Sequence, residues 1–242
     1  MPLYNEDCLV GMTRLADKSI DLILTDLPYG TTQNAWDFVL PLDRLWKEWK
    51  RIIKPTTAIV LFSQLPFSIT LAASNPRWLR YEWIWEKTCP TGFLNAKKMP
   101  LKSHENILVF YQKLPTYNPQ WWYSHPYKTT RHDNSSTCYR DFDKPTTTIS
   151  EDGRRYPTSV LRFKKDSPKR NGSHPTAKPE ALCQYLIKTY SNEGDTVLDC
   201  CAGSGTTLIA AQNTARQWIG YETNPDYYAF ALNRLTPKNL AI

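Results

Sequence analysis

Three acidic residues stand at or near the ends of short apolar runs, where a side chain can meet a bound ligand. Asp26 closes the run that begins at Ile20, Asp199 lies in TVLDCC, and Glu222 closes WIGYE. In open α/β sheets, ligands bind outside the carboxyl ends of the strands. If the three runs are parallel strands, we expect their acids to converge on one crevice.

The segment after Asp199, CAGSGTT, has the composition of a loop that approaches a ligand. Gly203 and Gly205 allow close approach of the backbone, and Thr206 opens a helix whose N-terminus attracts anions. Glu222 follows Asp199 at close to the spacing of about 20 residues at which an acid meets a ribose hydroxyl. The third glycine of the dinucleotide fingerprint is missing, which favours a smaller nucleoside-containing cofactor over NAD or FAD. An ordinary tight turn after a strand is the alternative interpretation.

The elements that would position these residues alternate between apolar runs and helical patterns. This alternation is typical of a parallel sheet covered by helices. The predicted strands are 20–26, 58–63, 82–87, 106–112, 195–201 and 217–222, and the predicted helices are 42–53, 66–74, 179–190, 205–215 and 225–235.

The pattern dissolves between about 113 and 178 into Pro, Ser, Thr and aromatic residues. A structureless loop of that length inside a compact domain is improbable. We therefore predict an inserted module with its own function, flanked by two halves of one larger domain.

The stretch DLPY, residues 26–29, resembles the D-P-P-Y motif of amino-methylating DNA methyltransferases, and DCCAGSGTT resembles their S-adenosylmethionine loop. The D-P-P-Y-like motif precedes the cofactor loop, as in the permuted beta group of these enzymes. Segments 92–110, 174–187 and 218–235 resemble the middle motifs of that group, its lead-in to the cofactor loop and its second cofactor motif. The resemblance covers most of the chain outside the insert.

The resemblance implies a Rossmann-like class I methyltransferase fold, an α/β fold with a mostly parallel sheet and helices on both faces. It implies that residues 1–112 form the catalytic half, 113–173 a target-recognition insert, and 174–242 the cofactor-binding half.

In this family the motif residues Asp26, Leu27, Pro28 and Tyr29 are implied to be catalytic. The adenine amino nitrogen is a poor nucleophile because its lone pair is drawn into the ring. Asp26 can accept one N–H and the backbone carbonyl of Leu27 or Pro28 the other, which aims the lone pair at the sulfonium. Tyr29 is placed to stack on a flipped base. Leu27 replaces a proline but keeps the carbonyl, so only rigidity is affected. A helix cap for Asp26 and a core ring for Tyr29 are the alternatives.

The same resemblance assigns the cofactor-binding residues. Glu222 is expected to hold the ribose hydroxyls, and Asp199 to lie beside the methionine part. Asp7 resembles the acid that meets the cofactor's adenine, and Lys178 could neutralise its carboxylate. A helix-capping role for Asp7 and a solvated Lys178 stay open. The loop itself is formed by Gly203, Gly205, Thr206 and Thr207.

A basic run in the insert points to double-stranded DNA. Residues 154–170 hold seven Lys and Arg and one acid, while the whole chain carries a net charge of +7. Such a concentration favours phosphate contact, with a solvated face as the alternative. The aromatic cluster 117–127 offers stacking rings, although most of them suit a small aromatic core. The predicted DNA-binding residues are Arg154, Arg155, Arg162, Lys164 and Lys165.

Other features of the sequence bound its class. No apolar stretch has membrane-spanning length, and the acidic N-terminal segment does not resemble a signal peptide, so we expect a cytoplasmic protein. As for its assembly, we expect a monomer or homodimer. The six cysteines form no CxxC pair and the four histidines have no ligand spacing, so we expect no metal.

Three other functions stay open. Cytosine amino methylation uses the same geometry, although Asp26 stands where cytosine enzymes often carry serine. Methyltransferases acting on RNA or on protein glutamine usually place the cofactor loop first. A catalytically silent DNA-binding protein would need neither the acid nor the glycine loop.

Overall fold

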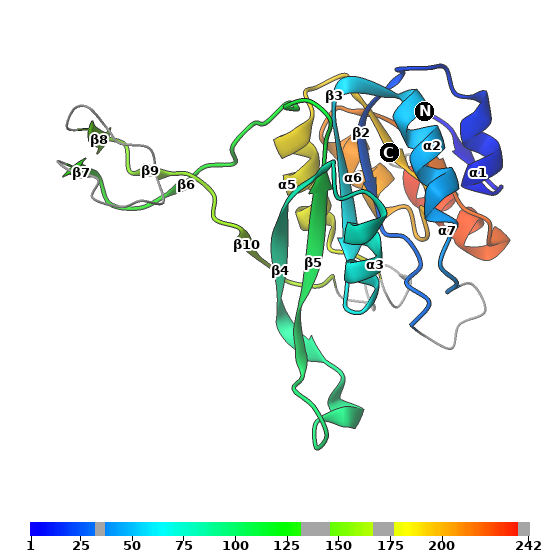
Figure 1. Ribbon diagram of the computed structural model, residues 1–242, viewed down its shortest axis with the longest axis horizontal. Coiled ribbons are helices and arrows are strands. Elements are labelled where there is room, and N and C mark those ends of the chain that lie inside the picture. Colours follow the sequence, from blue (N-terminus) through cyan, green and yellow to red (C-terminus); the bar gives the residue numbers. More distant parts are fainter. Residues whose placement is uncertain (32–36, 132–145, 167–176, 237–242) are drawn as a thin grey trace, which may run out of the picture. The chain divides into compact units, whose positions relative to one another are not determined.

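The computed structural model describes residues 1–31, 37–131, 146–166 and 177–236 (Figure 1). The chain divides into two compact units. The larger consists of Met1–Asn118 and Ser159–Ile242, and the smaller of Pro119–Thr158. Within the described ranges, no helix is long and apolar enough to cross a membrane.

The large unit is built on one mostly parallel sheet, which confirms the predicted α/β fold. In the described residues the sheet has eight strands in the order β1-β12-β11-β2-β3-β5-β4-β10, and among them β5 alone runs antiparallel to its neighbours. The strands are β1 (Leu3–Tyr4), β2 (Ile20–Thr25), β3 (Ile53–Ser63), β4 (Leu79–Thr91), β5 (Lys102–Phe110), β10 (Val160–Phe163), β11 (Thr196–Asp199) and β12 (Gln217–Tyr221).

Helices cover both faces of this sheet, as predicted. The central strand β2 has side chains buried on both faces, which is why its sequence is a continuous apolar run rather than an alternating one. Leu22 and Leu24 belong to the core under one helical layer, and Ile20 and Ile23 to the core under the other. The helices are α1 (Cys8–Gly11), α2 (Leu42–Ile52), α3 (Phe67–Ser74), α5 (Glu180–Tyr190), α6 (Thr206–Asn213) and α7 (Pro225–Leu235), with 3-10 turns η1 (Met12–Arg14) and η2 (Phe93–Asn95).

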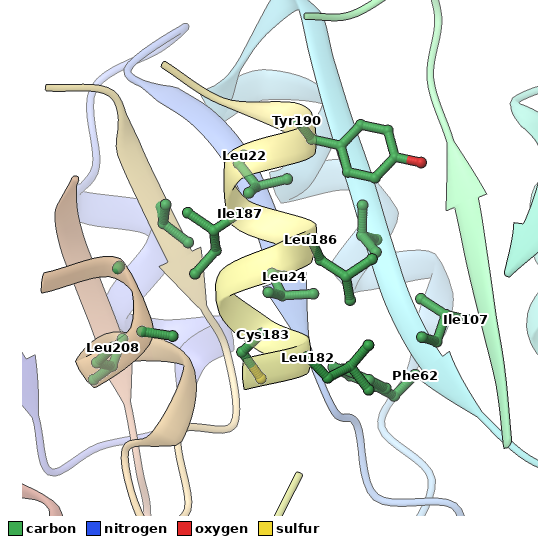
Figure 2. Close-up of a cluster of buried hydrophobic side chains, with 14 of the residues drawn as sticks. Leu22, Leu24, Phe62, Ile107, Leu182, Cys183, Leu186, Ile187, Tyr190 and Leu208 are labelled. Carbon is green, nitrogen blue, oxygen red and sulfur yellow. The ribbon is translucent and has the colours of Figure 1, made fainter. Parts of the chain in front are cut away.

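Helix α5 shows how the sequence spacing fixes the packing. Leu182, Leu186 and Tyr190 recur every fourth residue, so they lie on one face of the helix. Figure 2 shows this face packed on the sheet, with Leu24 of β2 among the side chains beneath it. This packing places the segment that leads into α5 beside the carboxyl end of β2, where Lys178 contacts Asp26.

In its described residues, the small unit contains two short antiparallel ladders. Strand β6 (Trp122–Tyr123) pairs with β9 (Arg154–Arg155), and β7 (Tyr127–Arg131) with β8 (Thr146–Ser150). Gly153 has a φ of +75°, and a Cβ there would lie 1.9 Å from the carbonyl oxygen of Ser124. This turn therefore requires glycine.

The small unit is narrower than the insert predicted over 113–173. Strand β10 pairs in parallel with β4, so residues 160–163 belong to the main sheet. At the other boundary, Asn118 donates its backbone N–H to the carbonyl of Thr189 at 2.7 Å, which fastens it to the end of α5. These backbone pairings extend the large unit into both ends of the predicted range.

Candidate active site

A cavity of about 460 Å³ lies at the carboxyl ends of β2, β11 and β12. Asp26, Asp199 and Glu222 all line it, each placed at or just after the end of its strand. Among the described residues, no cluster of His, Cys, Asp or Glu could hold a metal ion. Other predicted site residues on its wall are Asp7, Leu27, Pro28, Tyr29, Lys178, Gly203, Thr206 and Thr207.

The turn after β2 is stiffened by an aspartate that the sequence analysis missed. Asp37 Oδ1 accepts the backbone N–H of Tyr29 and of Gly30, each at 2.8 Å, and its Oδ2 accepts that of Thr31 at 2.9 Å. Leu27 is 2 % exposed and anchors the turn in the core. Three hydrogen bonds to a carboxylate and one buried side chain thus supply the rigidity that a second proline would give. Asp37 follows the N–H groups that it accepts by six to eight residues, so no local turn pattern in the sequence points to it.

Asp26 lies at the more exposed end of a largely buried row of alternating charges. Its Oδ2 accepts a hydrogen bond from Lys178 Nζ at 2.6 Å, and Lys178 Nζ lies 3.1 Å from Glu105 Oε2. Lys87 Nζ in turn lies 2.7 Å from Glu105 Oε1. The other carboxylate oxygen of Asp26, Oδ1, accepts the hydroxyl of Tyr29 at 2.6 Å. Side chains hold both oxygens, so Asp26 does not act as a helix cap.

Charges within the row shift the pKa values of Asp26, Lys178 and Glu105. Burial raises the pKa of Asp26, and the charge of Lys178 opposes that rise. Burial would lower the pKa of Lys178, but the carboxylates of Asp26 and Glu105 raise it above the ordinary value. Although burial acts in the opposite direction, Lys178 and Lys87 hold the pKa of Glu105 below its ordinary value. The lysine is therefore charged at neutral pH and favours an ionised Asp26.

Lys178 was expected to neutralise the cofactor carboxylate. In the structure its ammonium group contacts Asp26 and Glu105, and the side chain lines the cavity. Lys178 is buried, so it is not the solvated lysine given as the alternative. Glu105 and Lys87 were not predicted as site residues. The signal in the sequence is that both flank apolar runs, WIWEK and ENILVF, whose strands pair as the β4–β5 hairpin.

The Tyr29 ring is half-buried and stacks on Phe67, with ring centroids 5.2 Å apart and an interplanar angle of 21°. Lys178 Nζ lies 5.6 Å from the centroid of the same ring. Burial raises the pKa of the Tyr29 hydroxyl well above its ordinary value, helped by the charge of Asp26. The phenol therefore stays protonated and donates to Asp26.

The glycine loop lies between β11 and α6. Gly203 and Gly205 have φ values of +51° and +76°, and a Cβ at Gly205 would lie 3.0 Å from Cβ of Ala231 in α7. A Cβ at Gly203 would meet nothing within 4 Å, because the loop faces open space there. Glu222 Oε2 accepts the N–H of Gly203 at 2.7 Å and its Oε1 that of Asn224 at 2.8 Å. The acid and the loop are therefore held together on one wall of the cavity.

Two further acids on this wall have structural partners as well. Asp199 Oδ1 accepts the Thr25 hydroxyl at 2.7 Å, and burial raises the Asp199 pKa to about 6. Asp7 accepts the N–H of Leu9 at 2.7 Å and caps α1, the capping role given as its alternative, yet it also lines the cavity.

The predicted DNA-binding residues are divided between the two units. Arg154 and Arg155 belong to the small unit, where their guanidinium groups lie 5.4 Å from the Trp121 ring centroid and 4.0 Å from that of Tyr127. In the large unit, Lys165 lines the cavity. Lys169 and Arg170 of the basic run lie outside the described residues. On or just after β10, Arg162, Lys164 and Lys165 are all exposed.

Comparisons with known proteins agree with this geometry. The chain is similar to the type II methyltransferase M.HpaI of Haemophilus parainfluenzae, with 29 % identity over 96 % of this chain and 73 % of that protein. It is similar to the DNA adenine methyltransferase YhdJ of Escherichia coli, with 28 % identity over 96 % of this chain and 82 % of that protein.

Two solved structures share the fold. The M1.HpyAVI–SAM complex has a TM-score of 0.64 at 22 % identity, covering 96 % of this chain and 98 % of the other. The cytosine-N4-specific PvuII DNA methyltransferase has a TM-score of 0.69 at 16 % identity, covering 99 % and 87 %. The family described as DNA methylase (N6_N4_Mtase) matches residues 20–233, which is most of the sequence. The chain therefore belongs to the DNA methylase family, as its motifs indicated.

Proposed function

We propose that this protein transfers a methyl group from S-adenosylmethionine to the exocyclic amino group of a flipped adenine in double-stranded DNA. The observation that carries the proposal is the Asp26 carboxylate, held between Tyr29 and Lys178 on the wall of a cavity that also presents Glu222 and the glycine loop. Its family and the naming of YhdJ as a DNA adenine methyltransferase support it.

The residues present fit the cofactor. Glu222 is an acid for the ribose hydroxyls, Asp7 reaches the same cavity, and the left-handed turn at Gly203 leaves open space beside the loop. The cofactor supplies the methyl group as a sulfonium. The chain's own residues bind it, exclude water and orient the base.

Asp26 can hold the amino group without losing its existing partners. An ionised carboxylate offers about four lone-pair sites, and Tyr29 and Lys178 occupy one on each oxygen. A remaining site accepts one amino N–H, and the backbone carbonyl of Leu27 or Pro28 accepts the other. Both acceptors draw the nitrogen lone pair out of conjugation and aim it at the methyl group.

A cytosine amino group would fit the same acceptors, and the PvuII enzyme that shares the fold is cytosine-N4-specific. We favour adenine because Asp26 is the acid of the adenine-type motif. The test is incubation with labelled S-adenosylmethionine and random-sequence duplex DNA, followed by digestion to nucleosides. Label in N6-methyladenine supports the proposal, and label in N4-methylcytosine overturns the choice of base. We also propose that the protein acts in the cytoplasm. Its oligomeric state is proposed to be a monomer or homodimer, and sedimentation with and without duplex DNA measures that state.

Glu222→Ala is expected to weaken S-adenosylmethionine binding by about 10-fold or more. The ribose loses a charged acceptor worth about 1.5 to 3 kcal/mol per hydrogen bond, and the Gly203 N–H loses its partner. Calorimetry measures the affinity, with the exposed Asp226→Ala in α7 as matched control. An unchanged affinity would remove Glu222 from the cofactor site.

Replacing Arg162 and Lys164 together by alanine is expected to weaken binding to all duplex sequences alike. Each lost phosphate contact lowers the slope of log affinity against log salt by about 0.9, so the slope should flatten by roughly 2. Lys165 is left in place because it lines the cavity. Parallel salt plots for wild type and variant would mean that these residues form only a solvated face.

A further inference from the structure

The β4–β5 hairpin carries an exposed apolar tip. Thr91 pairs with Lys102, and residues 92–101 form the turn between them, including η2. Figure 1 shows this hairpin projecting beyond the other strands of the main sheet. Phe93 and Leu94 are 78 % and 84 % exposed, and Met99 and Leu101 are exposed as well. Large apolar side chains gathered in one exposed place mark a site of interaction.

The charge of the tip selects the kind of partner. Between Thr91 and Lys102 the sequence TGFLNAKKMPLK has three lysines and no acid. Lys97 and Lys98 are exposed beside the apolar residues. An apolar wedge flanked by cations matches the interior of a base stack between two phosphate backbones.

The hairpin rises from the wall of the catalytic cavity. Lys87 and Thr91 of β4 and Glu105 of β5 line the cavity. Strand β3 is parallel to β2, and β5 is antiparallel to both β3 and β4. Strand β4 therefore runs in the same direction as β2. The tip therefore projects from the sheet edge at which Asp26 stands. From Lys87 to Thr91 the strand spans about 13 Å, more than the roughly 8.5 Å depth of the DNA major groove.

We propose that this tip inserts into duplex DNA beside the target adenine, with Phe93 and Leu94 entering the base stack and Lys97 and Lys98 contacting phosphates. The proposal rests on the proposed function. Extruding a base leaves a gap in the stack and costs a few kcal/mol in lost pairing and stacking. Apolar side chains that fill the gap stabilise the open duplex while the base occupies the cavity.

The test compares two duplexes that carry a methylation site found by sequencing the products of the wild-type reaction. In one, the target adenine is paired. In the other, an abasic site faces it, so the base has no pairing partner. The double variant Phe93→Ser/Leu94→Ser is expected to lose at least about 10-fold in single-turnover rate on the paired duplex and less than about 3-fold on the abasic one, because unpaired bases are the least costly to flip.

The matched control is Leu114→Ser. Leu114 is 76 % exposed and follows the opposite end of β5, so it should leave both rates unchanged. Equal losses on the two duplexes, or no loss on either, would overturn the insertion while leaving the enzyme's function intact. So would a wild-type dimer that dissociates in the double variant, since the tip would then be a subunit contact. A wild type that methylates no DNA removes the proposed function and the insertion together.

Discussion

Asp26→Ala is expected to lower methyl transfer to DNA by roughly two orders of magnitude or more, while S-adenosylmethionine affinity stays within a few-fold. The carboxylate is the acceptor that localises the amino lone pair, and loss of one positioned polar group from a transition state has effects of this size. Cofactor affinity should survive because Glu222, which lines the same cavity, keeps its contacts to Gly203 and Asn224.

Single-turnover transfer and calorimetry measure the two quantities separately. Asp26→Asn serves as the conservative comparison because it keeps a carbonyl acceptor and loses the charge that pairs with Lys178. Asp43→Ala in the first turn of α2 serves as the control for loss of an acid elsewhere. Near-normal turnover in Asp26→Ala would remove Asp26 from the chemistry.

Lys178→Met should combine the largest loss of stability with a large loss of activity. The substitution leaves Asp26 and Glu105 as two largely buried carboxylates without the cation between them. Removal of one partner from a buried ion pair costs about 3 to 5 kcal/mol. Lys54→Met is the matched control, because its pair with Asp21 is half exposed and surface pairs contribute about 0 to 1 kcal/mol. Denaturant unfolding measures both variants.

The pH dependence separates a positioning role from a packing role. In wild type the raised pKa of Lys178 keeps its contribution to stability present at neutral pH, and it is lost only as pH rises through that value. In Lys178→Met the pKa of Asp26 should rise further, and the pKa of Glu105, which Lys178 helps to hold down in wild type, should rise as well. Its residual transfer rate should then increase with pH, while its free energy of unfolding decreases as the buried carboxyls ionise. If the transfer rate of Lys178→Met were lower by the same factor at every pH, Lys178 would have only a packing role.

The sequence predicted those parts of the site in which local pattern and tertiary environment agree. Strands β2 and β11 are buried on both faces, so they appear as apolar runs, and their terminal acids follow from the parallel arrangement. The glycines were recognisable because their left-handed backbone favours that residue.

The charged row was not predictable in the same way. Glu105 stands opposite Trp85 only through the register of an antiparallel pair, and its meeting with Lys178 depends on the chain that enters α5. Charged side chains on strands are usually solvated, so composition alone cannot mark a buried one. Strand β10 was missed for a similar reason: four residues are too few to show a period, and its pairing with β4 decides its structure.

The pairing of β1 with β12 has a consequence for synthesis of the protein. Leu3 lies opposite Gly220, and Asn5 Nδ2 donates to the carbonyl of Glu222 at 2.7 Å. The wall that carries Asp7 therefore takes its place only when a strand made more than two hundred residues later emerges from the ribosome. Contacts between residues so far apart in the sequence are slow to form, because the chain must lose the entropy of closing a long loop before the contacts stabilise it. The nascent chain therefore cannot complete this side of the cavity before β12 has been made.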